Sequence, residues 1–240
     1  MPALKPASPS LRLLYCHHVF DDEVPGFEAC LDLLSQMGRF VDTPTAVAAI
    51  RGDIAITETL YHLSFDDGYR NIISNALPVL HRLGVPAIFF VPTAQIGNPA
   101  GTKGEGSARI ELATWDELES AQAKGLQIGS HTRTHARLSE ISNSIAAIED
   151  EILGSKADIE ERLGPCPYIS WPYGRARDTD AAALAVVQQA GYDACFGAFR
   201  AQVMPGKTDL FRIPRHHFES GWPLSHLRYF ARGGMEGRHT

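Results

Sequence analysis

The sequence predicts an α/β fold in which about seven strand-then-helix units form a closed or nearly closed (β/α) barrel in a single domain. Three observations predict this class. Short apolar runs alternate with amphipathic helical patterns, no internal linker interrupts them, and 240 residues is a length typical of one barrel. The alternation indicates a parallel sheet wrapped by helices, and so many units in this length favour a barrel over an open doubly wound sheet.

The strands are predicted from short apolar runs that end at polar or turn residues. The run AIFFV at 87–91 is almost wholly apolar, which is typical of a parallel strand covered on both faces. The predicted strands are 11–16, 60–65, 87–91, 126–129, 168–171, 193–196 and 211–214.

The helices are predicted from apolar residues at helical spacing and from signals at their ends. Pro44 lies in the first turn of one helix, Thr114 and Glu117 form a capping box before another, and Gly38 and Gly84 follow two more. The predicted helices are 26–37, 43–50, 71–83, 115–124, 142–163, 178–190 and 222–231.

Composition and charge exclude several classes of protein. The formal net charge of −6, without long blocks of one sign, argues against a nucleic-acid binder. No apolar run reaches the ~18 residues of a membrane span, and the first ten residues lack the apolar core of a signal peptide, so we expect a cytoplasmic protein. We expect residues 1–10 to be a flexible segment, 11–240 the folded domain and the Gly-rich stretch 98–107 a loop.

The unusual polar residues of this chain come directly after predicted strands. His17, Asp66 and His131 each follow an apolar run, and Tyr173 and Arg212 lie after or near the end of two others. In a parallel barrel the C-terminal ends of the strands surround one mouth, where chemistry is built. The sequence therefore predicts that these distant residues converge on one site.

Asp67, His131 and His135 fit a catalytic metal site in type and number, because such an ion takes about three protein ligands and keeps one position open. Asp66 is then left to act as a general base. Neighbouring residues of an extended segment point in opposite directions, so the two carboxylates can divide these roles only if the chain turns, which Gly68 permits. Each motif alone has an ordinary explanation, as a turn or helix cap for the carboxylates and as core or surface histidines for the imidazoles.

Further side chains are candidates for roles at the mouth. His17 is a candidate general acid or a hydrogen-bonded core histidine, and the backbone N–H of Tyr173 is a candidate oxyanion donor or part of a simple turn. Arg212 is a candidate for orienting the base through a charged hydrogen bond, or an ordinary surface arginine. Trp171 and Tyr69 are candidates for stacking on a sugar ring, and core packing is as good an expectation for Trp171.

Three segments resemble signatures of the NodB-like polysaccharide deacetylases, carbohydrate esterase family 4. FDDG at 65–68 resembles the first signature, SHTRTH at 130–135 the second, and WPYG at 171–174 the third. The resemblance extends from about residue 11 to about residue 214, and the first two motifs in this order are highly specific.

The resemblance implies a distorted (β/α)7 barrel, and a divalent metal of the Zn²⁺ type, with Co²⁺ or Ni²⁺ as alternatives, held by Asp67, His131 and His135. It implies Asp66 as base, the amide of Tyr173 in an oxyanion hole, and hydrolysis of an N-acetyl group on a sugar, oligosaccharide or polysaccharide precursor. Two rival hypotheses stay open, a same-fold amidohydrolase acting on a non-sugar C–N bond and a glycan-binding barrel without catalysis. The oligomeric state stays open too.

The chain also departs from the family pattern in places. LYCHHV at 14–19 resembles an element of the subgroup that deacetylates poly-N-acetylglucosamine, which would make His17 the general acid, but Cys16 stands where a Tyr is usual. The third motif commonly begins with an Arg that braces the base, and Ser170 stands there instead.

Overall fold

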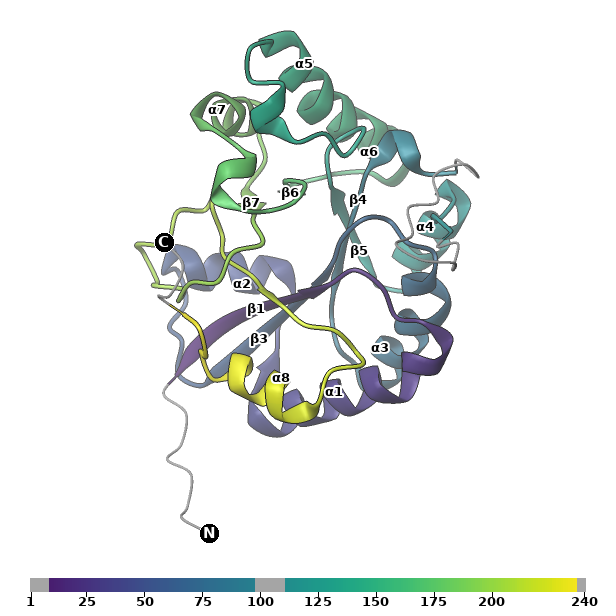
Figure 1. Ribbon diagram of the computed structural model, residues 1–240, viewed down its shortest axis with the longest axis vertical. Coiled ribbons are helices and arrows are strands. Elements are labelled where there is room, and N and C mark those ends of the chain that lie inside the picture. Colours follow the sequence, from purple (N-terminus) through teal and green to yellow (C-terminus); the bar gives the residue numbers. More distant parts are fainter. Residues whose placement is uncertain (1–8, 98–110, 237–240) are drawn as a thin grey trace.

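Parallel strands form the centre of the molecule, and helices lie around the outside of the sheet (Figure 1). This computed structural model describes residues 9–97 and 111–236. The strand order is β7-β6-β5-β4-β3-β1-β8, with β2 also paired to β3. The strands are β1 (Ser10–Cys16), β2 (Arg39–Phe40), β3 (Thr59–Phe65), β4 (Ile88–Val91), β5 (Gln127–Ser130), β6 (Tyr168–Ser170), β7 (Ala194–Phe196) and β8 (His216–His217).

The segment that follows β7 closes the curled sheet. Ile213 forms a parallel bridge with Phe196 of β7, and His216 and His217 pair with Leu14 and Tyr15 of β1. Residues 213–217, which we call the closing segment, therefore connect the two edges of the sheet. The predicted α/β class and distorted barrel are confirmed, although the last strand lies at β8 and not at 211–214.

Most predicted elements agree with the structure to within a few residues. The two-residue strand β2 was not predicted, because so short a pairing leaves no apolar pattern. β1 begins at Ser10, one residue before the predicted domain boundary. Residues 1–8 of the predicted N-terminal segment and the predicted loop at 98–107 lie outside the described residues.

Helices connect the successive strands from β1 to β7, as the alternation predicts. The predicted helices at 71–83 and 142–163 contain π-turns, η2 (Ile72–Ala76) and η5 (Asp150–Gly154). At η2 the cause is visible, because Pro78 has no N–H to donate to the carbonyl four residues earlier. The α-helices are α1 (Val24–Met37), α2 (Thr43–Arg51), α3 (Leu77–Leu83), α4 (Trp115–Ala123), α5 (Ile145–Glu149), α6 (Ser155–Leu163), α7 (Ala181–Gln189) and α8 (Leu224–Ala231). Within the described ranges, none of the helices has the length and apolar character needed to span a bilayer.

Alternate strand residues pack on opposite faces of the sheet. Leu13 and Phe90 share one buried cluster with Phe196, whereas their neighbours Leu14 and Phe89 share a second cluster with residues of α1 and α3. This alternation follows from the two-residue period of a strand. Because the strands are parallel, their C-terminal ends meet at one edge of the sheet, and the candidate site lies there.

Candidate metal centre

Asp67, His131 and His135 lie together beyond the ends of β3 and β5. Each offers one ligand atom, and these atoms lie within 4.8 Å of one another. Oδ1 of Asp67 is 3.4 Å from Nε2 of His131 and 3.1 Å from Nε2 of His135. The structure therefore brings together the three residues that the sequence predicted as ligands.

The orientation of His131 suits a metal ligand. Its Nδ1 lies 2.7 Å from the carbonyl oxygen of Ser170, which can only accept, so the proton of the neutral ring is on Nδ1. In the neutral ring the lone pair of Nε2 points toward Asp67, whereas in the protonated ring Nε2–H donates to the Asp67 carboxylate. One carboxylate and two imidazoles held in this way are the donor set of a catalytic zinc site, so the residues present fit a divalent cation.

The charges of the cluster are strongly coupled. Burial raises the pKa of the Asp67 carboxyl, but hydrogen bonds from His131 and His135 outweigh the burial and hold the pKa well below its usual range. Burial by itself lowers the pKa of His131. The negative charges of Asp66 and Asp67 raise it and together outweigh the burial, so the pKa of His131 lies above its ordinary value. The site thus favours positive charge beside an ionised Asp67.

The backbone around the cluster adopts an uncommon conformation. Four non-glycine residues there have positive φ: Asp67 (73°), Thr132 (63°), His135 (64°) and Tyr173 (64°). Elsewhere in the described chain only Met235 does so among non-glycine residues. Such residues cost roughly 1–3 kcal/mol each and gather at functional sites. The turn at Asp67 is the one that the two adjacent carboxylates require to divide their roles.

Asp66 is buried next to the cluster and is held by Arg215 of the closing segment. Nη1 of Arg215 donates to Oδ1 of Asp66 at 2.8 Å, and Nη2 donates to Oδ2 at 2.7 Å. Burial raises the pKa of Asp66, but the charge of Arg215 and then that of His131 lower it to below its ordinary value. The pairing keeps Asp66 ionised and fixes the plane of its carboxylate.

The prediction that Arg212 orients Asp66 is wrong. Arg212 is exposed in the turn that precedes the bridge at Ile213, whereas Arg215 lies within the closing segment and is fully buried. The replacement of the family's usual Arg at Ser170 is also explained, because Nη2 of Arg215 donates to Oγ of Ser170 at 2.7 Å. A small side chain on β6 leaves room for a guanidinium that comes from the closing segment instead.

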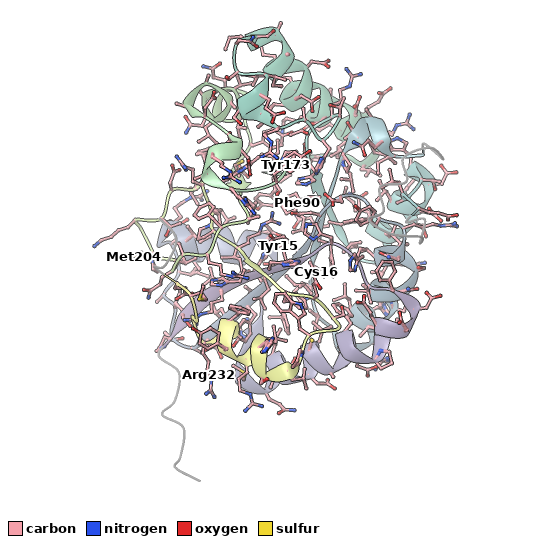
Figure 2. All side chains as sticks on the ribbon, in the orientation of Figure 1. Tyr15, Cys16, Phe90, Tyr173, Met204 and Arg232 are labelled. Carbon is pink, nitrogen blue, oxygen red and sulfur yellow. The ribbon has the colours of Figure 1, made fainter. Side chains whose placement is uncertain are left out.

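His17 lies beside the end of β1 in a group of rings. Its centroid is 5.4 Å from that of Tyr15 and 5.3 Å from that of His217. The charge of His17 is among the influences that lower the pKa of Asp66 and of Asp67, which places the imidazole near both carboxylates. Figure 2 labels Tyr15 near the middle of the fold and Tyr173 above it in that view. The role of His17 as general acid stays a prediction.

His217 is a further residue of the site that the sequence did not identify, because it lies beyond the last predicted strand, 211–214. It lies on β8, and burial, followed by the charge of His17, lowers its pKa to about 4. His217 is therefore neutral at pH 7. Pairing of β8 with β1 is what brings this ring to the site, and a two-residue strand carries no periodic signal.

Tyr173 lies in the turn after β6, beside the candidate ligand His135. Tyr173 is 48% exposed, and its ring centroid lies 5.1 Å from that of His135. The guanidinium carbon of Arg137 lies 3.9 Å from the Tyr173 ring centroid, on a ring face. The next residue must be glycine, because a Cβ at Gly174 would lie 2.1 Å from Cβ of Ala198. The turn is thus fixed in position, while the oxyanion role of its amide stays a prediction.

The two rings predicted to stack on a sugar are not available for this. Trp171 is 1% exposed, its Nε1 donates to the carbonyl of Arg175 at 3.2 Å, and it stacks on Phe199, so the alternative of core packing is correct. Tyr69 is also buried, and the pKa of its hydroxyl is raised by burial, by the charge of Asp67 and by a hydrogen bond to Asp67. Tyr69 therefore supports the carboxylate of a candidate ligand.

Comparisons with known proteins agree with this geometry. The sequence pattern of the polysaccharide deacetylase family matches residues 55–195, more than half of the chain. The poly-beta-1,6-N-acetyl-D-glucosamine N-deacetylase of Staphylococcus aureus (strain MRSA252) is 27% identical over 161 residues, which cover 64% of this chain and 52% of that protein. The chain thus spans about half the length of the curated relatives that it matches.

Solved structures show the same fold. IcaB from Ammonifex degensii superposes with a TM-score of 0.79 at 23% identity, over 94% of this chain and 98% of that chain. The deacetylase PplD from Streptococcus pyogenes superposes with a TM-score of 0.74 at 18% identity, over 93% and 98%. With the family pattern spanning the three candidate ligands as well as Asp66 and Tyr173, the chain belongs to the polysaccharide deacetylase family.

Proposed function

We propose that this protein is a metal-dependent hydrolase that removes N-acetyl groups from a carbohydrate. One observation carries the proposal: a buried carboxylate, held by the bidentate contact with Arg215, lies directly beside a cluster of three metal-ligating side chains. A barrel that only binds glycans needs no such carboxylate. The S. aureus relative is an N-deacetylase of poly-beta-1,6-N-acetyl-D-glucosamine by name, which supports an N-acetylated sugar, oligosaccharide or polysaccharide as the substrate.

Asp67, His131 and His135 would hold the ion through one carboxylate oxygen and two Nε2 atoms. Zn²⁺ is the ion we propose, with Co²⁺ or Ni²⁺ as substitutes, because mixed nitrogen and oxygen donors suit it. When bound, the ion supplies Lewis-acid chemistry, by polarising the amide carbonyl and making the attacking water more acidic.

The other residues of the site divide the proton transfers. Asp66 takes a proton from the attacking water as the C–O bond forms, and Arg215 keeps that carboxylate ionised and in plane. The backbone N–H of Tyr173 donates to the developing oxyanion. His17 gives a proton to the departing nitrogen as the C–N bond breaks, so acetate and a free amine are the products.

The first test is acetate release before and after metal removal. The protein is assayed with an activated acetyl ester and with N-acetylglucosamine oligomers, then treated with a chelator, dialysed, and supplied with Zn²⁺ or Co²⁺. We expect activity to vanish with the chelator and return with the ion. Activity that is unchanged after verified metal removal would overturn the proposal. A panel of non-sugar amides decides between a carbohydrate and another C–N substrate.

A second test separates catalysis from binding. Asp66→Asn keeps the shape of the side chain but removes the base. We expect turnover to fall by about 10²–10⁴-fold while metal content stays at the wild-type level. Unchanged turnover would refute the role of Asp66, and equal glycan affinity without product in both proteins would favour a binding barrel.

A further inference from the structure

Glu151 is a buried carboxylate outside the proposed ligand set. It lies in the π-turn η5, between α5 and α6, and is 6% exposed. Its Oε2 accepts from the backbone N–H groups of Arg133 at 3.0 Å and Thr134 at 2.9 Å, and its Oε1 accepts from the hydroxyl of Thr134. Its partners are thus the residues that connect the candidate ligands His131 and His135.

The same stretch of backbone is held from the opposite side. The carbonyl groups of residues 132, 133 and 134 accept from the N–H groups of Thr93 and Ala94 and from the side chain of Gln95, at 3.2, 2.8 and 2.7 Å. These donors belong to the 3-10 helix η3 (Thr93–Gln95), which follows β4. Donors from η3 and an acceptor from η5 therefore hold residues 132–134, which we call the ligand loop.

The ligand loop needs outside support because its backbone is strained. Thr132 and His135 have φ of 63° and 64°, and they bracket the two residues that Glu151 contacts. Positive φ is unfavourable for a β-branched residue such as Thr132, so the loop does not hold this shape by local preference. This shape is what directs His131 and His135 at the same point in space.

We propose that Glu151 is the positioning residue for the metal centre, fixing the ligand loop so that the two imidazoles stand at ligand spacing before a cation binds. A site arranged in advance binds more tightly because less ordering is required on binding. Glu151 reaches the ion only through the backbone of the loop. The inference rests on the proposed function in one respect, that His131 and His135 are ligands.

Glu151→Gln tests this inference, because the NH₂ group of glutamine cannot accept hydrogen bonds and one oxygen must serve all the donors. Asp150→Asn is the matched control. Asp150 is the preceding residue of the same turn, loses the same charge, and contacts the loop only through the exposed side chain of Arg133, at 2.6 Å. The readouts are Zn²⁺ affinity by chelator competition, the visible absorption of the Co²⁺ form, and thermal unfolding without metal.

We expect Glu151→Gln to bind Zn²⁺ roughly 10–100-fold more weakly and to change the Co²⁺ spectrum, as substitutions of supporting residues at metal sites do. Asp150→Asn should stay within about twofold of wild type, since exposed pairs contribute little. If Glu151 only stabilised the fold, Glu151→Gln would lower the unfolding temperature of the metal-free protein. The Co²⁺ spectrum and the Zn²⁺ affinity of the folded variant would then be unchanged. That result would overturn the proposal.

Thr134→Val keeps the proposal testable even if Glu151→Gln does not fold. It removes one hydroxyl donor to the same carboxylate from an exposed residue and keeps the shape of the side chain. Losing one hydrogen bond of about 1 kcal/mol should weaken Zn²⁺ binding about fivefold, and wild-type affinity would overturn the proposal. His131→Ala isolates the underlying assumption: if that variant binds Zn²⁺ as tightly as wild type, the proposed metal centre itself is wrong.

Discussion

The two sides of the candidate site are built in different ways. The metal side, Asp67, His131 and His135, lies inside the stretch 55–195 that matches the family pattern. The closing side, which we define as His17, Arg215 and His217, lies outside that stretch. The metal side is shaped by local turns with positive φ, whereas the closing side is assembled by pairing of distant strands.

Because the two sides are built differently, we expect substitutions in them to have different effects. On the metal side the backbone strain is confined to local turns. Removal of a ligand side chain should therefore abolish metal binding without unfolding the barrel. A site assembled by pairing contains a buried ion pair between residues 149 positions apart, so losing Arg215 leaves Asp66 charged and unpaired inside the barrel. Substitutions on the metal side should therefore reduce metal binding, whereas substitutions on the closing side should reduce stability or slow proton transfer.

The largest effect is expected on the metal side. His131→Ala removes the Nε2 donor at the centre of the cluster, so we expect no bound metal after dialysis, and with it no metal-dependent turnover. Metal analysis and circular dichroism measure occupancy and fold together. Full occupancy in a folded variant would refute the ligand role of His131.

On the closing side, Arg215→Met should destabilise the metal-free protein by about 3–5 kcal/mol, because it leaves a buried carboxylate without its partner. Urea unfolding measures the change. Arg212→Ala is the matched control and should change the free energy of unfolding by less than about 0.5 kcal/mol, since its side chain is exposed. Equal effects of the two substitutions would contradict the contrast between Arg215 and Arg212.

His17→Gln should affect rate alone. We expect the acetate release rate to fall about 10²–10⁴-fold with normal metal content, because a proton donor is lost and no ligand is. His18→Gln, a change at the next residue, is the control and should leave the rate within about threefold of wild type. A His17 variant with wild-type rate at every pH would remove His17 from the mechanism.

The smallest effect concerns pH. The pKa of His217 is lowered to about 4 in the folded protein, so between about pH 6.5 and 4 the unfolded chain binds a proton that the folded protein does not. The contribution of His217 to stability is therefore lost as the pH falls through this window, by at most about 1.4 kcal/mol per pH unit. His217→Gln should show a shallower loss in urea unfolding over the same range. An identical slope in both proteins would mean that His217 does not titrate differently on folding.

What could be predicted from the sequence follows the same division. The sequence identifies Asp66, Asp67, His131 and His135 because the Asp-Asp pair and His131 each follow an apolar strand directly and the residue types suit one metal site. Arg215 was missed because RIPRHH contains two arginines, and only the pairing of the closing segment decides which one faces inward. Sugar stacking is wrong for Tyr69, and for Trp171 the sequence left stacking and core packing open, since burial of an aromatic ring depends on neighbours that come from other elements.

The position of the closing segment late in the sequence has a consequence for folding during synthesis. A ribosome releases Asp66 long before Arg215, which follows 149 residues later. Until Arg215 is synthesised, no guanidinium compensates for the desolvation of the Asp66 carboxylate. We therefore expect this carboxylate to stay hydrated in the nascent chain. Under the proposed function, a chain stalled before Arg215 emerges carries the candidate ligand motifs but lacks the partner of the proposed base, so we expect it not to release acetate.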